Sequence, residues 1–248
     1  MNAARPLLLA AFALSACAVL PGIAHAEGLQ VAPVSVTIPE RAGVLWLTNQ
    51  GDQPLRAQVR VFRWSQVDGE DVLTETTDLV ASPPFVAIAA QAQQVVRLVR
   101  LGETASAAAQ CEQTFRIIVD ELPGTPAPEQ TGLQYVLRYS VPVYLTNPAC
   151  QNSAPVLTWR LEAAEDGVAI LVENTGQQHA QLADLALLDS QGQRLEVQGG
   201  LVGYVLPGQQ RRFAVPGMAA SAANGGNLEV SVNGARVIAP VLLSRPGQ

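Results

Sequence analysis

The feature that most constrains the fold of this chain is a two-residue alternation of apolar side chains, repeated in short runs. In residues 115–119, for example, Phe115, Ile117 and Val119 are separated by other residues. Comparable runs in the first part of the chain are residues 34–38, 44–47, 58–64, 95–101 and 133–145. Because successive side chains of a strand point to opposite faces, this period predicts half-buried β-strands.

Turn-forming residues separate these runs, and the pattern continues through the rest of the chain. Asp68-Gly69, Pro83-Pro84 and Pro123-Gly124 are such turn signals. Later strand-like runs are residues 158–161, 168–173, 182–188, 194–197, 212–215, 228–232 and 237–243. The alanine-rich residues 104–110 are the only helix-like stretch, and they are too few for a stable isolated helix. Short strands separated by turns predict an all-β sandwich architecture.

A polar segment with two prolines, residues 146–155, divides the strands into two groups. Such a composition is typical of a hinge between domains. The second group has about seven strands in about 95 residues, which matches one immunoglobulin-like sandwich. We therefore predict two immunoglobulin-like β-sandwich domains, residues 27–147 and 148–248, joined by a short hinge.

The first 26 residues have the pattern of a removable export signal. An arginine precedes an apolar run, residues 7–20, and residues 24–26 read Ala-His-Ala. This order predicts a signal peptide that is cleaved after Ala26. The run is short and ends at Pro21-Gly22, which argues against a membrane anchor. A lipoprotein-like box ending at Cys17 is the alternative, but the apolar sequence that continues beyond it favours ordinary cleavage.

Composition excludes several kinds of chemistry. All 15 basic residues are arginine, so neither a P-loop lysine nor a lysine Schiff base is available. His179 is the one histidine after the leader, and its polar neighbours predict a surface turn without a chemical role. A net charge of −6 without a basic stripe argues against nucleic acid as a partner. We expect no enzymatic activity, no cofactor and no metal.

Several short motifs occur in a fixed order after the leader. They are Leu47-Thr48-Asn49, Ala81–Pro84 with Gln94–Leu98, Asp120–Pro123, Leu133–Leu137 with Val141–Tyr144, Val172–Thr175 and Val205–Gly208. Together they resemble the periplasmic pilus-assembly chaperones of the PapD type, over the whole mature chain. The Val-Pro-Val-Tyr sequence at 141–144 looks most like the archaic, spore-coat-U-type branch.

The resemblance implies a periplasmic chaperone with a binding cleft between two sandwiches set at an angle. Its partners would be pilus or fimbrial subunits with an incomplete immunoglobulin-like fold, and an outer-membrane usher that receives them. No membrane span is expected in the mature chain. The alternative function is a structural or adhesive envelope protein of tandem immunoglobulin-like domains without chaperone activity.

A donor strand is the central expectation from the family. Such a strand completes the sheet of the subunit through main-chain pairing and alternate side chains, a mode known as donor-strand complementation. Leu133, Tyr135 and Leu137 match the donor positions, and Tyr139 continues the same face. The alternative is that this face belongs to the domain's own core, and the alternation leaves the choice open because Val136 is also apolar.

The family also binds the C-terminal carboxylate of the subunit with basic residues, but Pro33 and Pro142 occupy those positions here. Any anchor must therefore be an arginine, which binds a carboxylate through two parallel hydrogen bonds. Arg116 is the first candidate, because it alternates with apolar neighbours and should point away from the core. Arg138 and Arg97 are further candidates, for which a solvated strand charge is the better interpretation.

Two further features are expected to rigidify the chaperone. Cys111 and Cys150 remain after the leader, and an even number in an exported protein indicates a disulfide, with two free thiols as the alternative. In the family fold, the strands that flank these cysteines are antiparallel neighbours, which implies that the pair meets. Glu121 resembles a family acid that fixes the angle between the domains, although its usual arginine partner is replaced by Asn147.

Overall fold

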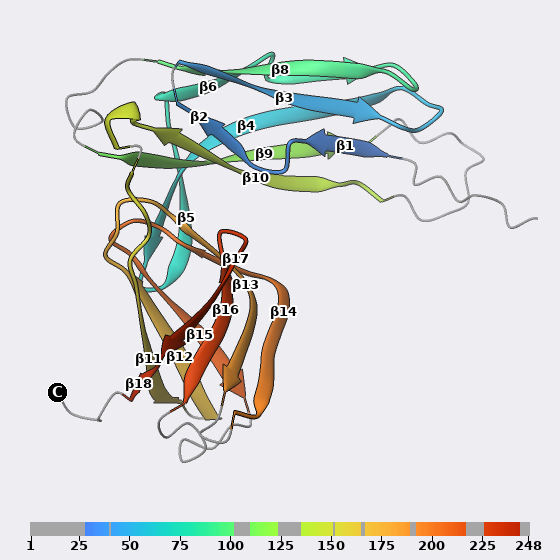
Figure 1. The fold of residues 1–248 in the computed structure, drawn as a ribbon. Coiled ribbons are helices and arrows are strands. Elements are labelled where there is room, and N and C mark those ends of the chain that lie inside the picture. The colour runs from blue at the N-terminus through green and yellow to red at the C-terminus, as the bar shows by residue number, and fades with distance from the viewer. Residues whose placement is uncertain are drawn as a thin grey trace, which may run out of the picture.

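The computed structural model describes residues 28–39, 41–101, 110–123, 135–150, 152–164, 167–188, 192–216 and 226–243. These residues form two β-sandwiches set at an angle, with a single 3-10 helix, η1 (Pro148–Cys150), near their junction (Figure 1). The predicted all-β fold is confirmed. The expected leader, residues 1–26, lies outside the described residues, as does most of the alanine-rich stretch.

The N-terminal sandwich consists of two sheets. The first has the strand order β1-β3-β8-β6, and the second has the order β2-β10-β9-β4-β5, with β7 paired to β4. The bounds are β1 (Leu29–Ala32), β2 (Val36–Ile38), β3 (Ala42–Asn49), β4 (Leu55–Val67), β5 (Glu70–Glu75), β6 (Leu79–Ser82), β7 (Phe85–Ile88), β8 (Gln93–Arg100), β9 (Glu112–Leu122) and β10 (Arg138–Thr146). The chain changes sheets between β1 and β2, so β2 lies against β10.

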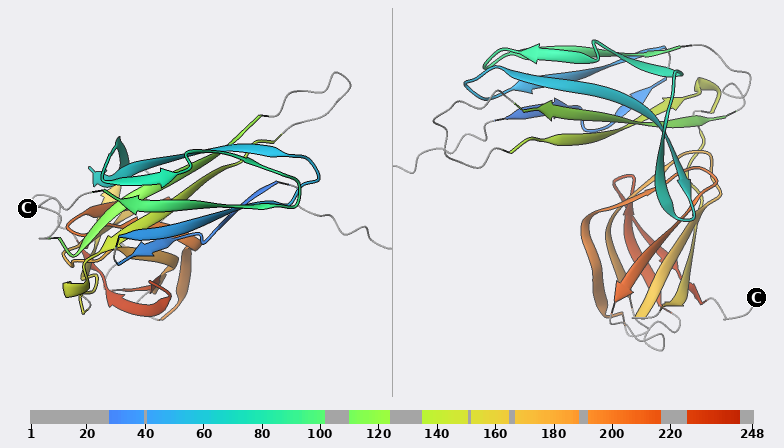
Figure 2. Two further views of the ribbon diagram at one scale, coloured as in Figure 1. Left: turned by 90° about the horizontal axis from the view of Figure 1, so that it is seen from above. Right: turned by 180° about the vertical axis from the view of Figure 1, so that it is seen from behind.

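The C-terminal sandwich also has two sheets, with the strand orders β15-β12-β11-β18 and β14-β13-β16-β17. The bounds are β11 (Leu157–Ala164), β12 (Gly167–Asn174), β13 (Ala180–Leu188), β14 (Arg194–Val205), β15 (Gln210–Pro216), β16 (Asn227–Val232), β17 (Ala235–Pro240) and β18 (Leu242–Leu243). Its strands run steeply across those of the N-terminal sandwich (Figure 2).

Each sandwich has its own core. Phe115, Ile117 and Val119 of β9 are fully buried between the two N-terminal sheets, on the face that their alternation predicts. Trp159 and Leu161 of β11 belong to a separate cluster between the C-terminal sheets. Two independent cores match the layered organisation of two small β domains.

Four strands of the N-terminal sandwich were not predicted from the sequence: β1, β5, β6 and β7. β1 precedes the first predicted run, residues 34–38. β5 is almost entirely exposed, so it has no buried alternation to detect. β6 and β7 are four residues each and flank Pro83-Pro84, where only a turn was predicted. Conversely, the predicted strand 133–145 is assigned only from Arg138 onward. Within the described part of the chain, no helix has the length and apolar character needed to cross a membrane.

The hairpin of β4 and β5 extends beyond the N-terminal sandwich and lies along the C-terminal one (Figures 1 and 2). Its tip approaches β15, since a Cβ atom added to Gly69 would lie 3.7 Å from the backbone nitrogen of Arg212. Gly69 has a φ of +82°, which suits a glycine in this tight turn. The hairpin therefore connects the two sandwiches beside the hinge.

Candidate functional site

The N-terminal half of β10 is an open sheet edge. On one side β10 pairs with β9 along its whole length, from Arg138 opposite Asp120 to Thr146 opposite Glu112. On the other side β2 pairs with β10 only at residues 143–145. Among the described residues, no strand therefore pairs with residues 138–142 on the outer side.

The backbone phase shows which groups this edge presents. Glu121 N–H donates to the carbonyl of Leu137, and Asn147 N–H donates to the carbonyl of Cys111. Odd-numbered residues of β10 therefore exchange hydrogen bonds with β9, and even-numbered residues direct their N–H and C=O groups outward. Ser140 thus directs outward an N–H that no described group accepts, whereas Pro142 has no N–H and its carbonyl lies where the β2 pairing begins.

The residues just before β10 continue this edge with exposed apolar side chains. Tyr135, Val136 and Leu137 are 77%, 49% and 39% exposed. Leu137 still accepts the hydrogen bond from Glu121, so the backbone pairing reaches one residue beyond the strand. Leu133 lies outside the described residues.

Tyr139 occupies a different environment from Tyr135 and Leu137. Its ring packs against the N-terminal core, and its hydroxyl donates a hydrogen bond to the carbonyl of Leu29. Burial raises the pKa of this hydroxyl, and the charge of Glu121 acts in the same direction. The alternative left open by the sequence, that this face belongs to the domain's own core, therefore applies to Tyr139.

Arg116 lies on the outer face of the second sheet, beside this edge. It stands opposite Pro142 on β10, at the point where the β2 pairing begins. Its guanidinium carbon is 3.7 Å from the ring centroid of Trp64 and 5.0 Å from that of Tyr204. Burial lowers the pKa of Arg116, an effect that Asp71 and the neighbouring tyrosines oppose.

The other two candidate arginines lie elsewhere. Arg138 and Arg60 both form ion pairs with Asp120, on the same outer face but farther from the hinge. Burial alone would raise the pKa of Asp120, but the hydrogen bonds from these two arginines lower it overall. Arg97 is exposed on β8 in the other sheet, where its strand neighbours are Val44 and Ser82. The structure therefore brings neither residue to the position of Arg116.

A hydrogen-bonded cluster that sequence analysis missed connects the two sandwiches. The buried carboxylate of Glu112 accepts hydrogen bonds from the backbone N–H of His179, at 3.0 Å, and from its Nδ1, at 2.9 Å. The His179 ring stacks on Tyr144 with 3.5 Å between the centroids. The prediction that His179 is a surface turn residue is wrong, because its contacts come from the other sandwich.

Gln66 of β4 provides a second connection between the sandwiches. It is 3% exposed, and its side chain donates to the carbonyl of Tyr204 and accepts from the N–H of Leu206. Asp71 of β5 forms an ion pair with Arg211 at 3.1 Å. The hairpin of β4 and β5 therefore binds the C-terminal sandwich through the polar side chains of Gln66 and Asp71.

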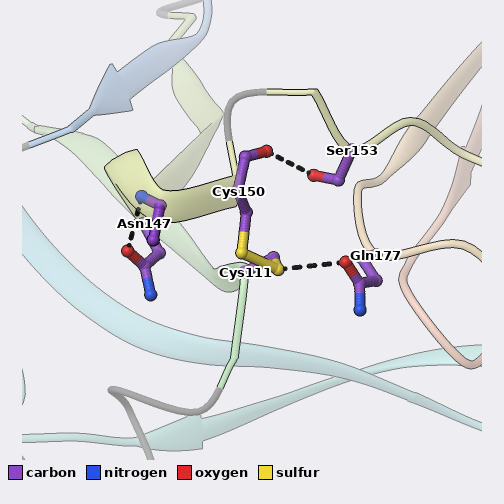
Figure 3. Close-up of a disulfide and its surroundings, with 6 residues drawn as sticks. Cys111, Asn147, Cys150, Ser153 and Gln177 are labelled. Atoms are coloured by element: carbon purple, nitrogen blue, oxygen red, sulfur yellow. Dashed lines mark hydrogen bonds between the residues drawn. A yellow bond between two sulfur atoms is a disulfide. The ribbon is translucent and has the colours of Figure 1, made fainter.

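The structure contains the disulfide between Cys111 and Cys150 (Figure 3). Cys111 directly precedes the buried Glu112, the first residue of β9, and Cys150 belongs to η1, so the disulfide joins these two elements. The Sγ atom of Cys111 also lies 3.1 Å from the Oε1 atom of Gln177 in the C-terminal sandwich. The bond therefore lies at the hinge end of β10 and not at its open end.

A pocket of about 430 Å³ lies between the sandwiches beside this disulfide. Its lining includes Arg63, Cys111, Glu112 and Gln177. No group of three or more His, Cys, Asp or Glu side chains within the described ranges is placed to hold a metal ion.

The expectation for Glu121 is wrong. Its carboxylate lies at the end of β9 away from the hinge, where it accepts a 3.3 Å hydrogen bond from the N–H of Leu137. The acids that contact the C-terminal sandwich are Glu112 and Asp71. The family motif pointed to Glu121 at the C-terminal end of β9, whereas the acid of β9 that contacts the C-terminal sandwich is Glu112 at its N-terminal end.

The family model described as the pili and flagellar-assembly chaperone, PapD N-terminal domain, matches residues 28–149. No curated protein matches the chain. The family expected from the sequence motifs is therefore confirmed over residues 28–149.

Solved structures of chaperones share the fold over most of the chain. In the CsuC-CsuE chaperone-tip adhesion subunit pre-assembly complex of the archaic Csu pili of Acinetobacter baumannii, one chain is 23% identical, with a TM-score of 0.67. The match covers 88% of this chain and 100% of that one. The Pseudomonas aeruginosa CupB2 chaperone is 16% identical, with a TM-score of 0.57 and coverage of 85% and 98%. A chain of the Salmonella enterica SafA pilin–SafB chaperone complex is 16% identical, with a TM-score of 0.59 and coverage of 87% and 95%.

Proposed function

This chain belongs, through residues 28–149, to the pili and flagellar-assembly chaperones with a PapD N-terminal domain, and we propose that it caps pilus subunits by donor-strand complementation. The open outer edge of β10 is the observation that carries this proposal. A subunit that lacks one strand exposes unpaired backbone groups, which would otherwise aggregate. The β10 edge offers the matching groups.

The side chains before β10 support the same role. Tyr135 and Leu137 alternate on one face and are exposed, as a strand needs if its side chains are to fill the pockets of a partner. Leu133, which matches the next donor position in the sequence, lies outside the described residues. Tyr139 packs against the chaperone's own core, so we place the C-terminal end of the donor segment just before it.

The start of β2 explains where the added subunit strand would end. Because β2 pairs with β10 from Val143 onward, a strand added parallel to β10 would stop near Pro142. Its C-terminal carboxylate would then lie two strand spacings, about 10 Å, from the backbone of Arg116 on β9. Among the described residues, Arg116 forms no ion pair. We propose Arg116 as the carboxylate anchor.

The remaining parts of the proposal follow from the family. The chaperone would act in the periplasm after removal of residues 1–26, would deliver its subunits to an outer-membrane usher, and would catalyse no reaction. In this scheme the driving force for release is the replacement of β10 by a better-fitting strand of the next subunit.

Periplasmic co-expression with the small exported proteins encoded beside the chaperone tests this function. We expect a one-to-one complex that is lost in Leu137→Arg, because a charge would enter an apolar pocket of the subunit. The matched control is Arg138→Ala, which lies next to Leu137 but faces the other side of the strand. A folded Leu137→Arg variant that still forms the complex would contradict the donor-strand proposal.

The alternative of a structural or adhesive envelope protein has a distinct outcome in the same experiment. Such a protein has no use for an open β10 edge and should remain a monomer that binds none of the co-expressed proteins. In that case the wild-type chain would be purified alone, and circular dichroism would verify its fold.

A further inference from the structure

The surroundings of Arg116 are built by both sandwiches. Trp64 comes from β4 of the N-terminal sandwich, and Tyr204 comes from β14 of the C-terminal one. The two rings are nearly perpendicular, with 5.4 Å between their centroids. The guanidinium of Arg116 lies in the corner between them, 3.7 Å from the Trp64 ring centroid. We call these three side chains the interdomain corner.

The corner leaves the guanidinium suited to bind an anion. Aromatic faces attract the cation and hold its plane, while the N–H groups at its edge stay available. The side chain is half-buried, and none of the ion pairs among the described residues includes Arg116. A carboxylate that reached this edge would therefore meet a held, partly desolvated cation.

The position of Tyr204 relative to Arg116 depends on the contact between the sandwiches, whereas its place within the C-terminal sandwich is set by the pairing of β14 with β13. The Tyr204 carbonyl accepts a 2.9 Å hydrogen bond from the side chain of Gln66, which also accepts one from Leu206 N–H at 3.0 Å. If the C-terminal sandwich moved away, Arg116 would keep Trp64 and lose Tyr204. The shape of the corner is therefore linked to the docking of the two domains.

We propose that Tyr204 is a positioning residue for Arg116, so that carboxylate binding and domain docking stabilise each other. This inference rests on the proposed function, in which Arg116 anchors the C-terminal carboxylate of a subunit. Because linkage is reciprocal, a contact that favours the docked domains must also favour the bound carboxylate, and the reverse. The C-terminal sandwich thereby contributes to recognition through an N-terminal arginine.

The test compares two synthetic peptides of the C-terminal strand of the co-purified subunit, one with a free carboxylate and one with a terminal amide. Calorimetry gives both dissociation constants, and their ratio isolates the carboxylate contribution. For the wild-type protein we expect the acid to bind about tenfold or more tightly than the amide, as a charge-assisted bidentate pair does. Arg116→Ala should reduce this ratio to about one.

Tyr204→Leu should reduce the ratio several-fold and leave binding of the amide unchanged, whereas Tyr204→Phe, which keeps the ring, should retain it. Gln66→Ala, which removes the hydrogen bond from β4 to the Tyr204 carbonyl, should act like Tyr204→Leu and serves if the latter fails to fold. A merely structural role would weaken acid and amide binding equally. The inference is overturned if both variants keep the wild-type ratio while Arg116→Ala loses it. A wild-type protein that binds neither peptide would instead contradict the proposed function itself.

Discussion

Replacement of Ser140 by proline tests the open edge of β10 directly. Ser140 is exposed, lies opposite Ile118 of β9, and has the outward phase established by the hydrogen bonds of Leu137 and Asn147. A proline there removes one outward N–H without removing a hydrogen bond to β9. Pro142 already occupies the same phase two residues later, so the strand accommodates a proline in this register.

The magnitude follows from the lost donor. A subunit carbonyl that pairs with Ser140 N–H would be left buried without a partner, at a cost of about 1–3 kcal/mol. The dissociation constant should therefore rise by about 5- to 150-fold. The free energy of unfolding of the chaperone itself should change by less than about 1 kcal/mol, since the ladder to β9 stays intact.

The assay combines subunit binding by calorimetry with urea denaturation of the free chaperone. Ser140→Ala is the matched control, because it removes the hydroxyl and keeps the N–H, and it should bind as the wild type does. Val141→Pro is the opposite control, because its N–H points toward β9 and its loss should destabilise the fold. A stable Ser140→Pro variant with wild-type affinity would refute the strand-pairing geometry.

Three further predictions concern stability and can be measured by urea denaturation. Joint replacement of Cys111 and Cys150 by serine should lower the free energy of unfolding by about 3–4 kcal/mol, since the bond closes a loop with a sequence separation of 39. Equal stability of the wild type with and without reductant would contradict this prediction. His179→Ala should cost about 2–4 kcal/mol, because the buried Glu112 carboxylate loses a donor and Tyr144 loses its stacking partner, whereas the exposed neighbour Gln181→Ala should change little. Arg63 donates a hydrogen bond to Asp78 and holds the pKa of that carboxyl below its ordinary value. The stabilisation is therefore present above about pH 4 and lost as the pH falls through the folded pKa, so wild type and Asp78→Asn should converge in stability at low pH.

Local alternation was sufficient for much of the fold and for one part of the site. Phe115, Ile117 and Val119 face the core as predicted, because the two faces of a strand differ only by sequence parity. The same parity predicted that Arg116 points away from the core, and it lies on the outer face with Trp64. Local alternation did not predict β5, because this exposed hairpin strand buries too few side chains to show an apolar alternation.

Contacts between distant residues determined the rest of the site. The polar neighbours of His179 predicted a surface turn, but Glu112, 67 positions away, places the ring in the junction. The alternation in residues 133–145 could not separate donor from core, because that depends on where β2 and the N-terminal core end against β10. Val141, Val143 and Leu145 are buried there, whereas Tyr135 and Leu137 extend beyond both.

The sequence by itself therefore determined most of the strands, their inward faces and the family, all of which follow from local periodicity and short motifs. The tertiary structure alone decided which part of β10 remains an open edge and which groups surround Arg116. Both are properties of packing between segments far apart in the chain: β2 covers one half of an edge, and a second sandwich brings Tyr204 to an arginine of the first. Local sequence carries no signal for such contacts, since their partners are distant in the chain and meet only when each sandwich folds and the two sandwiches dock.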